Sequence, residues 1–170
     1  PEAGRYDWSW LDETFERLPR AGVAIALATP SAAHPRWLTA LHPEVQMVDE
    51  NGVRTQHGVR QRFCPTSPVF RQHVERVNRA LAGRYGAHPA LALWHVSNEY
   101  CAPRCYCELC AAAFREWLKQ RYGDLETLNR QWWGAFWSQA YSDWAEVLPP
   151  TAPTGRAWQG QTLDWKRFQS

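Results

Sequence analysis

The sequence LALWHVSNEYCAPRCYCELC, residues 91–110, carries the clearest evidence for the fold class. It begins with a short apolar run after Pro89, and that run closes on the polar residues Ser97, Asn98 and Glu99. An apolar run of this length predicts a buried strand of a parallel sheet, over about 90–97. Parallel α/β enzymes place their chemistry at the carboxyl ends of such strands. Glu99 is therefore a candidate acid or base, and the cysteines after it are candidates to fasten its loop.

Strand and helix patterns alternate on both sides of this stretch. Residues 23–28 form a second apolar run that predicts a strand. Helices are predicted over about 8–21, 35–41, 68–85 and 108–122, and from about 125 on. Their expected caps and ends are Asp7, Gly22, Pro35, Ser67, Gly86, Gly123 and Asp124. The order strand, helix, strand, helix indicates a parallel α/β fold.

The number of strands limits how complete this fold can be. Only two clear strands in 170 residues are too few to close a sheet. The chain is therefore predicted to be an arc of a (β/α)8 barrel, whose full length is about 250 residues or more. The sequence begins without an initiator Met or a signal peptide, so we expect the true start to lie upstream. A long irregular stretch over about 42–65 is of the kind that is usually functional or disordered.

Composition excludes several classes of protein. The chain has 19 Lys and Arg against 17 Asp and Glu, and the basic residues are scattered, which argues against a nucleic-acid surface. No stretch approaches the roughly 20 apolar residues of a membrane span. The 11 Trp residues are unusual. They could be structural, or they could stack on sugar rings, and composition alone does not choose between these roles.

The cysteines point to a metal. There are five, an odd number, and four of them lie within ten residues. Cys105, Cys107 and Cys110 offer three thiolates at a spacing that suits tetrahedral zinc, and Cys64 is the natural fourth ligand. Disulfides or free thiols are the alternatives. The clustering favours a metal site in a reducing compartment, the cytoplasm.

Several motifs together resemble one family. The segment HVSNEY is followed by CYCELCAAAFREWLKQRYGDLETLNRQWWGAFWSQAYSDWAEVLPP, and upstream lie EAGRYDWSWLDE, ALATPSAAHPRWL and RQRFCPTSPVFRQH. These closely resemble the β-galactosidases of glycoside hydrolase family 42, almost continuously from Glu2 to Pro150. The resemblance implies that residues 1–170 belong to one catalytic TIM barrel, from roughly the end of strand 2 through strand 4 and the following helices. It also implies retaining hydrolysis of terminal non-reducing β-D-galactosides, with β-D-fucosides or α-L-arabinopyranosides as further possible substrates.

The resemblance also implies roles for individual residues. Glu99 would be the general acid/base, at the end of the fourth barrel strand, and Asn98 and Arg60 would bind the sugar. From the residues alone, Arg60 is an ordinary solvated cation of a loop. A structural zinc ion would be held by Cys64, Cys105, Cys107 and Cys110. The nucleophile would lie at the end of the seventh strand, downstream of Ser170, so we expect no activity from these 170 residues alone.

Three points stay open at this stage. Cys101 departs from the family, which usually has a small residue there, so Cys101 could replace one ligand or stay a free thiol. The family resemblance implies a homotrimer of full-length subunits. Two non-catalytic alternatives are a zinc-stabilised module that binds nucleic acid and a Trp-rich carbohydrate-binding module. The first would show two separated cysteine pairs and a basic face, and the second is generally rich in β-structure.

Overall fold

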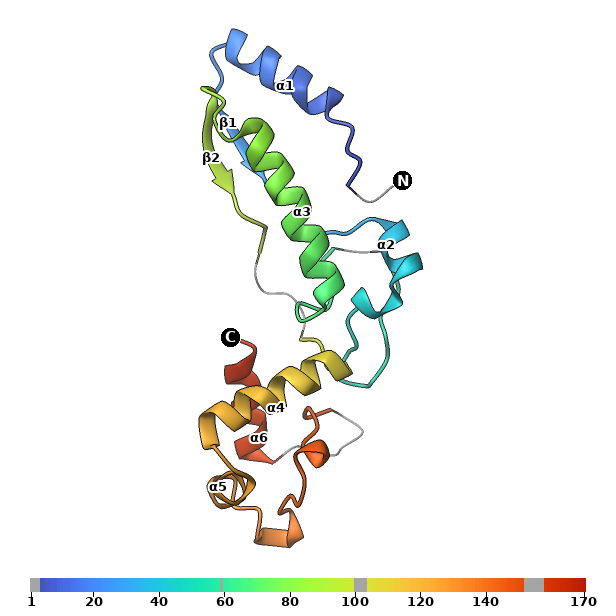
Figure 1. Ribbon diagram of the computed structural model, residues 1–170, viewed down its shortest axis with the longest axis vertical. Coiled ribbons are helices and arrows are strands. Elements are labelled where there is room, and N and C mark those ends of the chain that lie inside the picture. The colour runs from blue at the N-terminus through green and yellow to red at the C-terminus, as the bar shows by residue number, and fades with distance from the viewer. Residues whose placement is uncertain (1–3, 59, 100–103, 152–157) are drawn as a thin grey trace.

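The computed structural model of the chain describes residues 4–58, 60–99, 104–151 and 158–170. These residues form two parts that follow one another along the long axis of the molecule (Figure 1). The strand lobe, up to Glu99, contains both strands and three helices. The helical lobe, from Arg104 on, contains the other three α-helices. None of the described helices is long and apolar enough to cross a membrane.

The sheet confirms the predicted parallel order. Strands β1 (Ile25–Ala28) and β2 (Leu91–His95) pair in parallel, with Ile25 opposite Leu91 and Ala28 opposite His95. Helix α3 (Pro68–Tyr85) lies between them in the chain, so the strand lobe is a βαβ unit. The core of this unit combines side chains of α1, β1 and α3, namely Leu11, Phe15, Ile25, Leu27, Leu81 and Tyr85.

One expectation about the second strand is wrong. The run over 90–97 was expected to be buried, but Leu93 is 55% exposed and Val96 is 62% exposed. The reason is the number of neighbours: among the described residues, β2 pairs with β1 and with no strand on its other edge. A barrel strand owes its burial to strands on both sides and to the helices outside them.

The first five helices agree closely with the sequence patterns, whereas α6 was not predicted. Their bounds are α1 Ser9–Arg20, α2 Arg36–Leu41, α3 Pro68–Tyr85, α4 Glu108–Tyr122, α5 Leu125–Gln131 and α6 Gln159–Phe168. Short 3-10 turns lie at Pro43–Val45, Phe136–Ser138 and Trp144–Glu146. Ser67 and Asp124 cap their helices as predicted, by accepting hydrogen bonds from backbone N–H groups. Asp7 differs: Trp8 is the N-cap, and Asp7 instead accepts bonds from the N–H and hydroxyl of Ser9.

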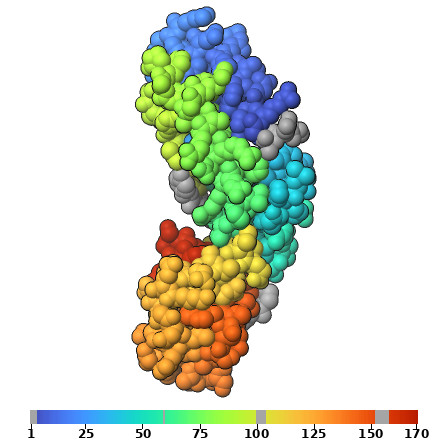
Figure 2. Space-filling model, viewed as in Figure 1, coloured from blue at the N-terminus to red at the C-terminus, as the bar shows by residue number. Residues whose placement is uncertain are grey.

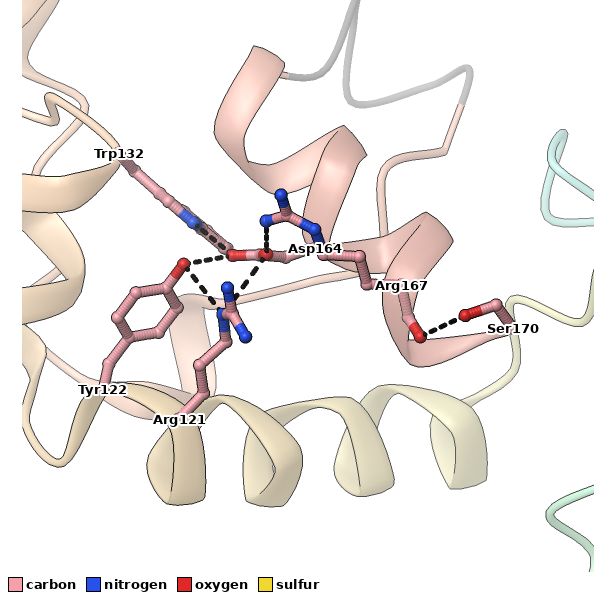
Figure 3. A network of polar contacts seen from close by, with 6 residues as sticks. All are labelled: Arg121, Tyr122, Trp132, Asp164, Arg167 and Ser170. Carbon is pink, nitrogen blue, oxygen red and sulfur yellow. Dashed lines mark hydrogen bonds and ion pairs between the residues drawn. The ribbon is translucent and has the colours of Figure 1, made fainter.

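The helical lobe has a buried carboxylate at its centre. Asp164 of α6 is 1% exposed, and it accepts hydrogen bonds from the Tyr122 hydroxyl at 2.5 Å and from the Trp132 indole N–H at 2.9 Å. The guanidinium groups of Arg167 and Arg121 lie 2.9 and 3.6 Å from its Oδ1 atom (Figure 3). Burial, followed by the bond to Asp164, raises the pKa of Tyr122, so its hydroxyl remains a donor. This network joins α4, the end of α5 and α6.

Loss of this carboxylate should weaken the helical lobe. We expect Asp164→Ala to lower the free energy of unfolding by about 2–4 kcal/mol, because two donors from Tyr122 and Trp132 lose a buried acceptor. Urea unfolding followed by circular dichroism measures the change. Glu126→Ala is the matched control: this carboxylate of α5 is 90% exposed, and its loss should change stability by no more than about 0.5 kcal/mol. Equal effects of the two substitutions would contradict the role of Asp164.

Candidate active site with an adjoining metal centre

Glu99 lies just beyond the carboxyl end of β2, in a turn with an unusual backbone. Ser97 and Glu99 have φ angles of 56° and 47°, in the left-handed region that side chains other than glycine seldom adopt. Each such residue costs about 1–3 kcal/mol and persists only where its surroundings hold it. The Thr29 hydroxyl, after β1, accepts the N–H of Ser97 at 2.7 Å. The sheet therefore supports the turn from the neighbouring strand.

The structure brings the three predicted sugar-site residues together. The Arg60 guanidinium contacts the Glu99 carboxylate, with 2.5 Å between Nη2 and Oε2. Asn98 precedes Glu99 and is half-buried. Both members of the ion pair remain accessible, since the side chains of Arg60 and Glu99 are 57% and 53% exposed. A carboxyl group and a guanidinium that reach solvent side by side can both bind the hydroxyl groups of a ligand. The carboxyl group can also exchange a proton with that ligand.

Asn98 and Glu99 open into a cleft between the lobes. Its volume is about 720 Å³, and its walls come from the loops after both strands, from the N-terminal half of α3, and from the beginning of α4 and the end of α6. Figure 2 shows the molecule hollowed on one side where the two lobes meet. Among the described residues that line the cleft, Glu99 is the one carboxylate. The cleft is large enough for a sugar, because small-molecule sites measure about 300–1,000 Å³.

Sequence reasoning missed one residue of this site. Gln61 donates a side-chain N–H to the backbone carbonyls of Asn98 and Glu99. Its only signal in the sequence is its place next to Arg60 in the motif RQRFCPTSPVFRQH. No sequence pattern predicts that a glutamine in a loop makes such a contact.

The four predicted cysteine ligands meet in one cluster. Their sulfur atoms all lie within 4.8 Å of one another, and all four side chains are buried. The Cys64 sulfur is 3.5 Å from those of Cys107 and Cys110, too far for a disulfide of about 2.05 Å. All four are free thiols. The fifth cysteine, Cys101, lies outside the described residues.

The donor set fits a tetrahedral metal ion. With Zn–S bonds of about 2.3 Å, the sulfur atoms of a tetrahedral site stand about 3.8 Å apart, close to the spacing seen here. Hydrogen bonds from the Cys105 and Cys110 thiols hold the pKa of Cys107 well below its ordinary value. Cys107 is also the N-cap of α4, and the positive end of a helix favours a thiolate. The group could therefore bind a metal ion.

The cluster also connects the two lobes. Cys64 precedes α3 in the strand lobe, whereas the other three cysteines lie at the beginning of α4. Neighbouring groups orient the sulfur atoms: the backbone N–H of Val48 lies 3.4 Å from Cys105, and the Thr66 hydroxyl lies 3.3 Å from Cys110. Arg60 lies four positions before Cys64, so an ion held here would fasten the loop that carries Arg60.

Comparison with known proteins gives one consistent result. The family described as beta-galactosidase (Glyco_hydro_42) matches residues 1–170. The chain is 51% identical over 168 residues to the beta-galactosidase BglY of Alicyclobacillus acidocaldarius, covering 99% of this chain and 24% of BglY. It is 47% identical over 169 residues to the beta-galactosidase GanA of Bacillus subtilis, covering 99% and 25%. The chain thus spans about a quarter of the length of the curated relatives that it matches.

Solved structures agree with this result. A structure of Gan42B, a GH42 beta-galactosidase from G. stearothermophilus, matches with a TM-score of 0.94 and 49% identity, over 99% of this chain and 25% of that one. The beta-galactosidase from Rahnella sp. R3 matches with a TM-score of 0.94 and 43% identity, over the same shares. At this identity and coverage, the chain has the backbone of the corresponding quarter of those proteins.

Proposed function

Since the chain belongs to the β-galactosidases of glycoside hydrolase family 42, we propose that it supplies the acid/base side of a retaining β-galactosidase. Residues 1–170 would form part of one catalytic TIM barrel, from about the end of strand 2 through strand 4. The observation that carries the proposal is the position of Glu99: it follows a parallel strand, contacts Arg60 at 2.5 Å and opens into a cleft of about 720 Å³. Carboxylates at such strand ends are typical catalytic groups of barrels.

The reaction would proceed in two displacements. In the first, Glu99 gives its proton to the glycosidic oxygen while a second carboxylate attacks the anomeric carbon, and the aglycone leaves as an alcohol. In the second, the Glu99 carboxylate takes a proton from water, whose oxygen attacks the same carbon and releases the enzyme carboxylate. Two inversions give net retention. Arg60 and Asn98 would hold sugar hydroxyls beside the reacting centre.

The second carboxylate is assigned to a part of the enzyme that this chain does not include. In a retaining enzyme it lies about 5 Å from the first. Asp143 and Glu146 cap the turn that they belong to, and Asp164 is enclosed by its network in the helical lobe. The chain spans about a quarter of its relatives, which leaves ample length for the missing group.

The cysteine cluster is proposed to hold structural zinc. Four protein sulfur ligands leave no open position for water, so the ion would supply a cross-link between the lobes and no chemistry. Four reduced thiols support a reducing compartment such as the cytoplasm for the whole protein. From the family resemblance, we further propose that full-length subunits form a homotrimer.

The stereochemistry of hydrolysis tests the proposed function. When the full-length protein cleaves 4-nitrophenyl β-D-galactoside, proton NMR in the first minutes should show β-galactose, before mutarotation produces the α anomer. The α-linked galactoside serves as the control and should not be cleaved. Initial release of α-galactose would overturn the double displacement. Sugar binding without any cleavage would favour a non-catalytic carbohydrate-binding protein.

A further inference from the structure

Gln61 connects three loops at the edge of the proposed active site. Its own φ is 60°, another left-handed backbone, and its backbone N–H donates to the carbonyl of Ala32, in the loop after β1, at 2.7 Å. Its side chain extends in a different direction, to the turn after β2, and is half-buried. The residue therefore links the loops that follow the two strands.

The side-chain contacts of Gln61 are specific to an amide. The Nε2 atom lies 2.9 Å from the carbonyl oxygen of Asn98 and 2.6 Å from that of Glu99. A primary amide nitrogen has two hydrogens, which matches two carbonyl acceptors. A glutamate of the same length would offer only acceptors and would repel both carbonyls. The contacts thus depend on the chemistry of the side chain and not on its size.

These two carbonyls lie on either side of the Glu99 Cα atom. Holding both of them fixes the peptide planes before and after Glu99, and with them the strained φ of 47°. The side chain leaves the backbone at the Cα atom, so its direction follows from these planes. Arg60, the preceding residue, contacts the Glu99 carboxylate itself. Two consecutive residues of one loop therefore hold the two ends of Glu99.

We propose that Gln61 is a positioning residue, which aims the Glu99 carboxyl at the glycosidic oxygen by binding the Asn98 and Glu99 carbonyls. This inference rests on the proposed role of Glu99. Without the amide, the turn relaxes toward an ordinary backbone conformation and the carboxyl moves away from the leaving group. Because the Gln61 amide nitrogen is already engaged by the two backbone carbonyls, we expect its loss to leave substrate binding unaffected and to slow proton transfer.

The choice of leaving group separates this role from a merely structural one. A sugar oxygen, such as that of the glucose released from lactose, is a poor leaving group and needs a proton in order to depart. The 2,4-dinitrophenolate ion is stable enough to depart without one. In the full-length enzyme, Gln61→Ala should lower kcat for lactose about 10- to 100-fold, the loss expected from displacing a catalytic group by about 1 Å. KM should stay within about 2-fold, and formation of the glycosyl-enzyme from 2,4-dinitrophenyl galactoside, followed by stopped flow, should change by less than about 3-fold.

Three further variants complete the experiment. Gln61→Glu, of equal length, should lose as much activity on lactose as Gln61→Ala. Gln56→Ala, an exposed glutamine of the same segment, should change nothing. Thermal midpoints are recorded for each variant, so that loss of folded enzyme is not mistaken for loss of rate. Equal loss on both substrates, or full activity of Gln61→Glu, would overturn the positioning role.

Glu99→Gln in the same assays separates this inference from the function on which it rests. If Glu99→Gln loses lactose hydrolysis and retains the dinitrophenyl step, while Gln61→Ala is unaffected, then the positioning role is wrong and the acid/base proposal stands. If Glu99→Gln itself is fully active on lactose, both fail.

Discussion

Glu99→Gln in the full-length enzyme is expected to lower kcat for lactose by about 100- to 10,000-fold, the usual contribution of general acid–base catalysis. The amide keeps the size of the side chain and can no longer give or take the proton. The loss should shrink on galactosides with acidic phenol leaving groups, because these depart without a proton. Initial rates across a series of phenyl galactosides measure this dependence.

A small anion provides the complementary test. Azide attacks the glycosyl-enzyme without the help of a base, so it should restore turnover of Glu99→Gln on an activated substrate and yield β-galactosyl azide. Wild-type enzyme serves as the control and should form free galactose with or without azide. A uniform loss across all leaving groups, with no rescue, would place Glu99 outside the proton transfer.

Cys64→Ser should have the largest effect on stability. Structural zinc couples its binding free energy to folding, so loss of a ligand should lower the free energy of unfolding by more than about 4 kcal/mol. The metal content of the purified protein should fall from about one zinc ion per chain to nearly none. Atomic emission spectroscopy and chemical denaturation measure the two quantities.

Cys101→Ser is the matched control, since Cys101 is the one cysteine outside the proposed ligand set. Its metal content and stability should equal those of the wild type. Loss of zinc from Cys101→Ser would make this residue a ligand. Retention of zinc and stability by Cys64→Ser would show that the four-sulfur cluster is not the metal site.

Local patterns predicted the elements well because their signals lie within a few residues. Helix α4 was expected over about 108–122 and spans Glu108–Tyr122, since Gly123, with a φ of 81°, ends it. The trio of cysteines from 105 to 110 was also a local signal. The burial of β2 was overestimated, because the sequence of one strand does not show how many other strands lie beside it.

Contacts between distant segments were harder to foresee. Arg60 and Glu99 are 39 residues apart, and only the family resemblance joined them. No local pattern marks Asp164, because the donors that enclose it, Tyr122 and Trp132, lie 42 and 32 residues earlier in the chain. The left-handed backbone of Gln61 depends on tertiary hydrogen bonds. No propensity of glutamine predicts it.

Within the described part of the chain, β2 has a partner strand on one edge alone, and this has a practical consequence for anyone who produces these 170 residues by themselves. Open N–H and C=O groups beside exposed apolar side chains, such as that of Leu93, form a template on which another extended polypeptide can add as a further strand. Such a preparation would tend to self-associate into β-rich aggregates. To stay soluble, the protein would then need the neighbouring strands of the complete barrel.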